Sequence, residues 1–503
     1  MTLTLLALGT KLSLDETGEL RYIGSLPPEL TLDAEGTQLG QGPVLDQRLR
    51  TGITLKSAED LWSVGTQWDL FSGQLAGDTW DVPGTIDERH REALGVLYSR
   101  SFLPREAGGS VRFGPLRVSA GLTSSHWGLG MLANDGDHDP EFGRTDFGDR
   151  VLRLRVGARP FQKGAFPLTV ALAGDRVVQD DLVHAGAFGP GGQVAWQGVA
   201  AALYTPQSGN KLGIYGVYRD QTEPVLEGES VGRKTRIGVV DVYGEAHAVL
   251  GPLLLRVGGE AAEIGGHTNR AETVNSIDGL DILSGGATGY VGVAGMSRSG
   301  VLDATAGPAR DLWSAKIRTG WASGDSDPDD GRSNDFTFDR DYDAGMLLFK
   351  EQMGGIEAAN YALISDPANA GHTPDGADLT VTEGSFRRAT FVQPVAEVDP
   401  LSWLGVRAGV MMAWSTGSIA QPFYTFRNGG SPTNHLDQPT TGRALGTEID
   451  WAVRVGGLPL GGGEEHSCPL APELLLQGAH LFSSADMGGG TATMLTATAR
   501  ARW

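Results

Sequence analysis

The sequence contains a single cysteine, Cys468, so no disulfide can form within the chain. This cysteine lies in a Gly- and Pro-rich turn without the neighbouring Cys and His residues that a zinc site requires. No run of about 18 apolar residues follows the N-terminus, which excludes membrane-spanning helices. A strand of a transmembrane barrel needs only about 10 residues with every second one apolar, so a barrel is not excluded.

Basic residues are in deficit, with 40 Lys and Arg against 61 Asp and Glu, and they form no basic run. The net charge of −21 and the absence of such a run argue against nucleic acid as a partner. Many of the Asp and Glu residues lie in residues 134–149 and 324–343, which we interpret as solvated loops. No repeated unit of about 20 to 50 residues is visible, which disfavours propellers and solenoids.

The last ten residues of the chain alternate between two faces. The apolar face carries Leu495, Ala497, Ala499, Ala501 and Trp503. The polar face carries Thr496, Thr498, Arg500 and Arg502. Such a terminal strand, ending on an aromatic residue, is typical of the last strand of an outer-membrane β-barrel, and we expect the barrel-assembly machinery to engage it. An edge strand of a soluble sandwich alternates in the same way, so this segment alone leaves both folds open.

Similar alternation recurs between clusters of Gly, Pro, Asp and Asn, most clearly in residues 48–55, 151–160, 252–262 and 404–412. The polar face favours Arg and Gly, whereas the water-facing side of a sandwich usually carries Lys, Glu and Thr. Gly beside Arg suits the curved inner wall of a barrel, where long side chains need room. Tryptophans near the ends of these stretches, Trp127 among them, resemble the aromatic girdles of such barrels.

Connection lengths give a strand count. Short links at residues 57–60, 104–109, 162–165, 206–210, 250–251 and 399–400 alternate with long polar links at 72–91, 131–149, 324–378 and 418–443. The long turn at 458–472 is an exception. If both ends of the chain lie in the periplasm, an even number of strands is required, which demands a first strand in residues 11–23 or 29–33. The count of strands that satisfies this condition is about 18, with 16 as the alternative.

These observations predict an all-β transmembrane antiparallel barrel in the outer membrane, with short periplasmic turns and long extracellular loops. Residues 11–503 form the single barrel domain, and residues 1–10 are the remnant of a signal or a disordered start. The lipid bilayer and lipopolysaccharide are the expected surroundings. We expect the long loop 324–378 to fold into or over the barrel mouth, anchored by Phe336, Phe338 and Tyr342.

Two segments resemble a known family. Residues 321–354 read WASGDSDPDDGRSNDFTFDRDYDAGMLLFKEQMG, and in residues 445–486 LGTEIDWAV is followed after a turn by LLLQGAHLFSSAD. Both are similar to alginate-export-type outer-membrane barrels and their uncharacterised relatives. The resemblance covers about a sixth of the chain closely and implies an 18-stranded barrel with a charged lumen. In the alginate exporters that lumen passes an anionic polysaccharide, but the motifs mark architecture rather than substrate.

Inward-facing cations form the main candidate site. They are Arg48, Arg50, Arg117, Arg153, Arg155, Arg256, Lys316, Arg318, Arg407, Arg454, Arg500 and Arg502. Guanidinium groups stay charged and bind carboxylate or phosphate in forked geometry, so a ring of them would select anions inside a pore. The alternative is a structural network in which the same cations pair with inward acids. Those acids are Asp69, Glu260, Glu448 and Asp450.

An acidic run offers a candidate metal site. It comprises Asp325, Asp327, Asp329, Asp330, Asn334 and Asp335. An EF-hand requires Gly at the sixth position and Glu at the twelfth, and the run has neither, so the match to an EF-hand fails. A looser external calcium site and a solvated acidic loop remain as the two interpretations. No other cofactor is expected.

Catalysis is not expected. His126 lies beside Ser124 and Ser125, and His138 lies between Asp137 and Asp139, but such residues are common in loops. Neither a G-x-S-x-G elbow nor a phosphate-binding P-loop is present, and closeness in sequence does not establish a triad.

Three functions follow as hypotheses. The first is a channel that passes a hydrophilic, anionic solute or polysaccharide through an Arg-lined lumen. The second is a barrel plugged by its long loops that serves as a structural or interaction platform in the outer membrane. The third is a secreted β-rich carbohydrate-binding protein or hydrolase.

Overall fold

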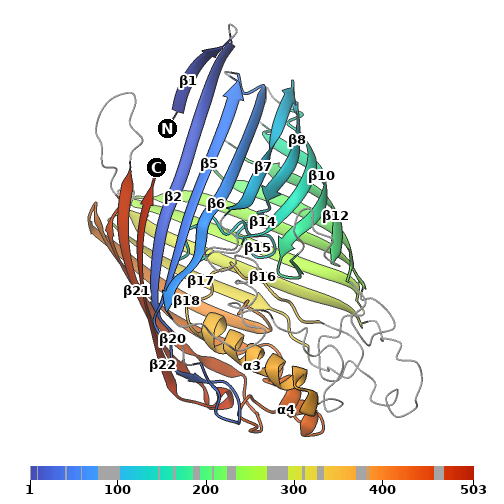
Figure 1. Cartoon of the computed structure of the whole chain (residues 1–503), viewed down its shortest axis with the longest axis vertical. Helices are drawn as coiled ribbons and strands as arrows, with labels where there is room; N and C mark the ends of the chain where they lie inside the picture. The colour runs from blue at the N-terminus through green and yellow to red at the C-terminus, as the bar shows by residue number, and fades with distance from the viewer. Residues whose placement is uncertain are drawn as a thin grey trace.

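The computed structural model describes residues 2–7, 10–39, 42–57, 59–77, 102–145, 148–161, 166–184, 193–206, 209–223, 234–268, 293–308, 312–325, 334–369, 382, 384–457 and 470–503. Within these residues the chain forms a closed antiparallel β-barrel of 18 strands (Figure 1). The predicted fold and strand number are confirmed, and the alternative of 16 strands is wrong.

The barrel strands run in chain order around the wall. They are β2 (Thr10–Leu26), β5 (Val44–Ser57), β6 (Trp62–Gly77), β7 (Phe102–Phe113), β8 (Leu116–Ser124), β9 (Arg150–Ala158), β10 (Leu168–Asp180), β12 (Val194–Tyr204), β13 (Lys211–Thr222), β14 (Lys234–Leu250), β15 (Leu253–Thr268), β16 (Val293–Pro308), β17 (Trp313–Ala322), β18 (Ala389–Leu401), β19 (Leu404–Ser415), β20 (Ala444–Gly456), β21 (Ala471–Ser483) and β22 (Thr491–Arg502).

Short strands and helices complete the fold. β1 (Thr2–Ala7) pairs with the start of β2, β11 (Val183–His184) pairs with β10, and β3 (Leu30–Thr31) pairs with β4 (Gln38–Leu39). The helical segments are η1 (Leu348–Met353), α3 (Gly354–Ser365), η2 (Pro367–Asn369), α4 (Pro422–Arg427) and η4 (Ala485–Met487). None of the helices in the described residues is long and apolar enough to span a membrane.

The predicted two-faced strands are observed. On β5, Ile53 is 49% exposed on the outer face while Arg50 is 6% exposed on the inner face. The same holds on β9, where Leu154 is exposed, and on β19, where Val406 is exposed. Successive side chains point to opposite sides of a strand, so every second apolar residue faces lipid and its neighbours face the lumen.

Loop lengths differ between the two ends of the barrel. Connections between β5 and β6, β14 and β15, and β18 and β19 are short and lie at the end where β2 begins and β22 finishes. Loops containing α3 and α4 lie at the opposite end from the β1–β2 hairpin (Figure 1). In an outer-membrane barrel, the short-turn end is periplasmic and the long-loop end is external.

Some predicted links are wrong. Residues 104–109 lie inside β7, and the turn follows at Gly114, which has φ +60°. Pro104 is tolerated because the β6–β7 register shifts beside it, as at a bulge. Likewise, residues 399–400 lie in β18 next to a register shift, and 72–77 belong to β6. Residues 78–91 of the predicted long link lie outside the described residues.

The barrel closes where the last strand meets the first. β22 pairs with β2 from Arg502 opposite Glu19 to Leu495 opposite Leu26. Beyond this register, the Trp503 N–H donates to the Gly18 carbonyl at 3.0 Å, and the Gly18 N–H donates to the Trp503 carbonyl at 2.9 Å. These bonds leave no open sheet edge between the first and last barrel strands, as a lipid environment requires.

Candidate functional site

The β8–β9 loop, residues 125–149, is docked onto the inner wall at one side. The Trp127 ring stacks on Tyr215 of β13 with centroids 5.0 Å apart, and its Nε1 donates to Asp241 of β14 at 2.8 Å. The Leu129 N–H donates to Glu260 of β15. Trp127 therefore lies in the lumen, and its predicted place in an aromatic girdle is wrong.

Acidic residues of the same loop form ion pairs with strands β5 and β22 on the opposite side of the lumen. Asp137 pairs with Arg50 of β5. Asp139 accepts hydrogen bonds from Arg500 and Arg502 of β22, each at 2.6 Å. Burial raises the pKa of the Asp139 carboxyl, but the bonds from Arg502 and Arg500 outweigh burial and hold that pKa below its ordinary range. The loop thus crosses the lumen, and our interpretation of these residues as a solvated loop is wrong.

Glu141 extends this contact to two further strands. Its carboxylate pairs with Lys316 of β17 and lies 3.3 Å from Arg407 of β19. Arg407 also donates to the Glu141 carbonyl at 2.7 Å and to Glu397 of β18 at 3.1 Å. Next to Glu141, the Phe142 ring covers Gly409, where a Cβ atom would approach the ring to within 2.9 Å. Inward glycine here makes room for an aromatic ring of the loop.

The other predicted lumenal arginines have partners on neighbouring strands or on the loops. Arg48 pairs with Glu19 (2.6 Å), Arg117 with Asp60, Arg153 with Asp175 (2.7 Å), Arg256 with Glu245 (2.9 Å), Arg318 with Asp343 (3.0 Å) and Arg454 with Asp399 (2.7 Å). Arg155 donates to Ser119 at 3.3 Å. This arrangement is compatible with both sequence interpretations, an anion path and a structural network.

Two residues of this network were not singled out from the sequence. Arg105 of β7 is 2% exposed and lies 3.7 Å from Asp69, which Arg50 also contacts at 2.7 Å. Gln477 of β21 donates to the carbonyl of Gly143 at 3.0 Å. Arg105 falls in the stretch interpreted as a turn, which concealed its inward direction. Gln477 carries no charge to mark it.

A second inward segment, the plug segment, comprises residues 334–365. Phe336 and Phe338 are fully buried and Tyr342 is 3% exposed, and their rings meet edge to face at 5.6 Å and 4.9 Å. The burial agrees with their predicted anchoring role. The Glu141 N–H donates to Asp343 at 2.5 Å, so the plug segment also contacts the β8–β9 loop. Together these two segments narrow the lumen.

Glu448 of β20 fastens the plug segment to the wall. Its carboxylate accepts the backbone N–H groups of Met346, Leu347 and Leu348 at 2.5, 2.8 and 2.7 Å. These groups begin the helical turn η1, where N–H donors have no partner within the helix. Gly345, with φ +77°, leads into this turn, and a Cβ atom there would lie 2.9 Å from the Glu448 carboxylate. Glu448 thus acts as a positioning residue of the plug segment. Its neighbour Asp450 accepts a bond from Gln393 at 3.3 Å.

The candidate calcium ligands are only partly described. Asp327, Asp329 and Asp330 lie outside the described residues. Asp335 is bound by Arg388 at 2.6 Å and by Arg387 at 3.1 Å. Burial raises the pKa of Asp335, but these two guanidinium groups lower it below its ordinary range. Among the described residues no group of three His, Cys, Asp or Glu side chains is placed to hold a metal ion. The calcium site stays a prediction.

The residues considered for catalysis have separate partners. Ser124 bonds Glu106, Ser125 accepts from Arg153 at 3.2 Å, and His126 lies 3.6 Å from Asp135. Asp137 and Asp139 pair with arginines, as described above. The structure therefore does not bring a Ser, a His and an Asp of this group together.

A cavity of about 160 Å³ lies between the β8–β9 loop and the inner faces of β2 and β18–β22. Guanidinium groups line it from several elements: Arg21, Arg144, Arg407, Arg454 and Arg500. Carboxylates line it as well: Asp139, Glu141, Glu397 and Glu473. Five positive groups against four negative ones leave the lining slightly cationic, although the protein as a whole is acidic.

An 18-stranded barrel with an apolar outer wall and a lumen narrowed by loops has the fold of the porin-like channels of the outer membrane. Acinetobacter baumannii OccAB1 is similar in structure, with 10% identity over 97% of this chain and 96% of that chain and a TM-score of 0.51. Pseudomonas aeruginosa OccK2 (11% identity, 97% of both chains, TM-score 0.48) and the P. aeruginosa outer membrane protein OpdK (12%, 97% and 99%, 0.47) were also found. No family model and no curated protein matches the sequence.

The fold and these comparisons bear on two expectations. The general class of outer-membrane barrels is supported, whereas the specific alginate-export family is not. A secreted β-rich protein is wrong as a hypothesis, because the chain forms a closed barrel of the outer membrane. At identities near 10% the similarity shows the fold alone, so no substrate is transferred from these proteins.

Proposed function

We propose that this barrel conducts small hydrophilic anions across the outer membrane, along the Arg-lined side of its lumen. The observation that carries the proposal is the cavity between the β8–β9 loop and β18–β22, where five guanidinium groups converge. Forked N–H donors of this kind suit carboxylate and phosphate groups. A confined lumen also focuses their field and screens it less than open water would.

A small solute fits better than a polysaccharide. Both the β8–β9 loop and the plug segment fold into the lumen, and the cavity beside them measures only about 160 Å³. An extended polymer would have to displace loop residues held by several ion pairs, such as Asp139 with Arg500 and Arg502. A monomeric anion needs only to exchange with one carboxylate partner at a time.

The test is ion selectivity in planar bilayers under a salt gradient. Replacing Arg407, Arg454 and Arg500 by Gln changes the cavity lining from an excess of one positive charge to an excess of two negative charges. We expect the chloride-to-potassium permeability ratio to fall by about threefold or more, because three charges are lost in a confined space. Arg236→Gln, which removes a 57%-exposed arginine from the outer face, is the matched control and should leave the ratio unchanged.

A second function, a plugged interaction platform, is favoured by the carboxylate partners of most lumenal arginines. An unchanged permeability ratio in the triple variant would mean that the arginines form a structural network that selects nothing. If neither the parent protein nor any variant conducts ions, the result would support the interaction platform and contradict the channel function.

A further inference from the structure

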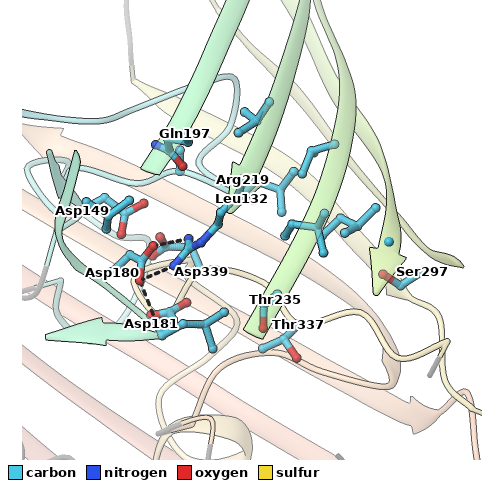
Figure 2. A pocket seen from close by; sticks show the side chains of 18 of the residues that line it. Leu132, Asp149, Asp180, Asp181, Gln197, Arg219, Thr235, Ser297, Thr337 and Asp339 are labelled. Carbon is cyan, nitrogen blue, oxygen red and sulfur yellow. Dashed lines mark hydrogen bonds and ion pairs between the residues drawn. The ribbon is translucent and has the colours of Figure 1, made fainter. Parts of the chain in front are cut away.

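A second cavity, of about 320 Å³, lies in the lumen between the two inward segments and the inner faces of β10–β16. Its volume falls within the range usual for small-molecule sites. Figure 2 shows four aspartates gathered at one end of it: Asp149, Asp180, Asp181 and Asp339. The remaining wall includes the apolar side chains Val217, Val239 and Ile264. The cavity therefore has an acidic end, and apolar side chains form part of its remaining wall.

Two of the four aspartates already have cationic partners. Asp180 pairs with Arg219 of β13, and Asp181 pairs with Arg340 of the plug segment at 2.9 Å. Arg387, which also lines the cavity, pairs with Asp335 at 3.1 Å, and Lys350 nearby donates to the carbonyl of Arg340. The positive charges that face the cavity from these elements are thus engaged with other groups.

Asp149 and Asp339 differ from the other two. Asp149 is 8% exposed, and its Oδ1 has no hydrogen-bond partner within the described part of the chain. Asp339 is 5% exposed, and the bond that its Oδ1 accepts comes from the Asp341 N–H at 2.8 Å. A buried carboxyl oxygen without a partner costs free energy, which a ligand that donates to it would recover.

The electrostatics agree with a missing positive charge. Burial, followed by the charges of Asp339, Asp180, Asp181 and Asp341, raises the pKa of Asp149 well above its ordinary value. Burial, followed by the charges of Asp181 and Asp341, does the same to the pKa of Asp339, although the hydrogen bond from the Asp341 N–H and the charge of Arg340 oppose the shift. A cation placed between these two carboxyl groups would lower both pKa values again.

We propose that this cavity binds an organic ammonium ion that has an apolar body. The ammonium group lies at the end formed by Asp149 and Asp339 and donates to their oxygens, and the apolar body packs against Val217, Val239 and Ile264. A bare metal ion fits less well, since the described residues hold no cluster of three suitable ligands. The apolar side chains of the wall have no ligand atoms for a metal ion, whereas they stabilise a hydrocarbon body by burying it.

Titration calorimetry on the full-length protein in detergent tests the proposal without requiring conductance, so the outcome is independent of the channel function. The probe is cyclohexylmethylammonium chloride, compared with neutral cyclohexylmethanol and with calcium chloride. We expect the ammonium to bind and the alcohol to bind at least about tenfold more weakly, because only the cation meets the carboxylates. Affinity should rise with pH, since a raised carboxyl pKa means that binding displaces a proton.

Asp149→Asn should weaken binding of the ammonium by about tenfold, because it removes one charge while keeping the shape. Asp486→Asn, at a carboxylate of η4 that caps the Thr441 and Gly442 N–H groups and does not line the cavity, is the control and should have no effect. If Asp149→Asn fails to fold, Val239→Phe enlarges an apolar lining residue so that it fills part of the cavity, and it should abolish binding. Equal binding of the alcohol, competition by calcium, or an unchanged affinity in both cavity variants would overturn the proposal.

Discussion

Glu448→Gln should release the plug segment and raise the single-channel conductance by about twofold or more. The carboxylate of Glu448 accepts three backbone N–H groups at 2.5 to 2.8 Å, and an amide side chain offers only one acceptor oxygen in its place. Bonds to a charged acceptor each contribute about 1.5 to 3 kcal/mol. A loss of about 2 kcal/mol corresponds to roughly thirtyfold in the opening equilibrium of the segment.

Two measurements check this expectation together. Planar-bilayer recordings report the conductance, and hydrogen exchange followed by mass spectrometry should show faster exchange of the amides of residues 346–348. Glu263→Gln is the matched control, because Glu263 pairs with Arg298 on the outer face at 2.7 Å. Deleting residues 326–339, which removes the buried Phe336 and Phe338, should change conductance in the same direction. Unaltered exchange and conductance in Glu448→Gln would show that the plug segment is held elsewhere.

Gly18→Val should prevent stable closure of the barrel. The Trp503 indole lies directly over Gly18, so that any Cβ atom at this position collides with the ring. The two residues also share a pair of backbone hydrogen bonds, so a backbone shift that relieved the collision would loosen the seam, and a rotation of the ring would remove its packing over Gly18. We expect a cost of about 3 kcal/mol or more, at the upper end of the usual cost of overpacking.

Heat-modifiable migration on a gel measures the folded fraction of this variant. Gly24→Val is the control on the same strand and the same face, because the nearest atom to a Cβ there is the Ala497 carbonyl oxygen at 3.9 Å. The control should migrate like the parent protein, whereas Gly18→Val should run mainly as the unfolded form. Equal folded fractions in the two variants would show that the terminal tryptophan does not secure the seam.

The sequence alone predicts which wall residues face the barrel interior, but not which loop residues pair with them there. Alternation on β5 and β9 correctly placed Arg50 and Arg153 inward, since that pattern is local. The loop acids that pair with Arg50, Arg407 and Arg500, which are Asp137, Glu141 and Asp139, were assigned to solvent. Nothing near Asp137 or Glu141 in the sequence distinguishes a loop that folds inward from one that extends into water.

Local periodicity by itself predicted the strands and the two faces of the wall, because neighbouring side chains on a strand point to opposite sides. The connection lengths left 18 or 16 strands open, and the closed structure decided for 18. Only the tertiary structure decided which charges meet in the lumen. Arg407 and Glu141 are 266 positions apart, and Arg502 and Asp139 are 363 apart. Such pairs depend on the closed wall, since closure brings strands from both ends of the chain around the same loop.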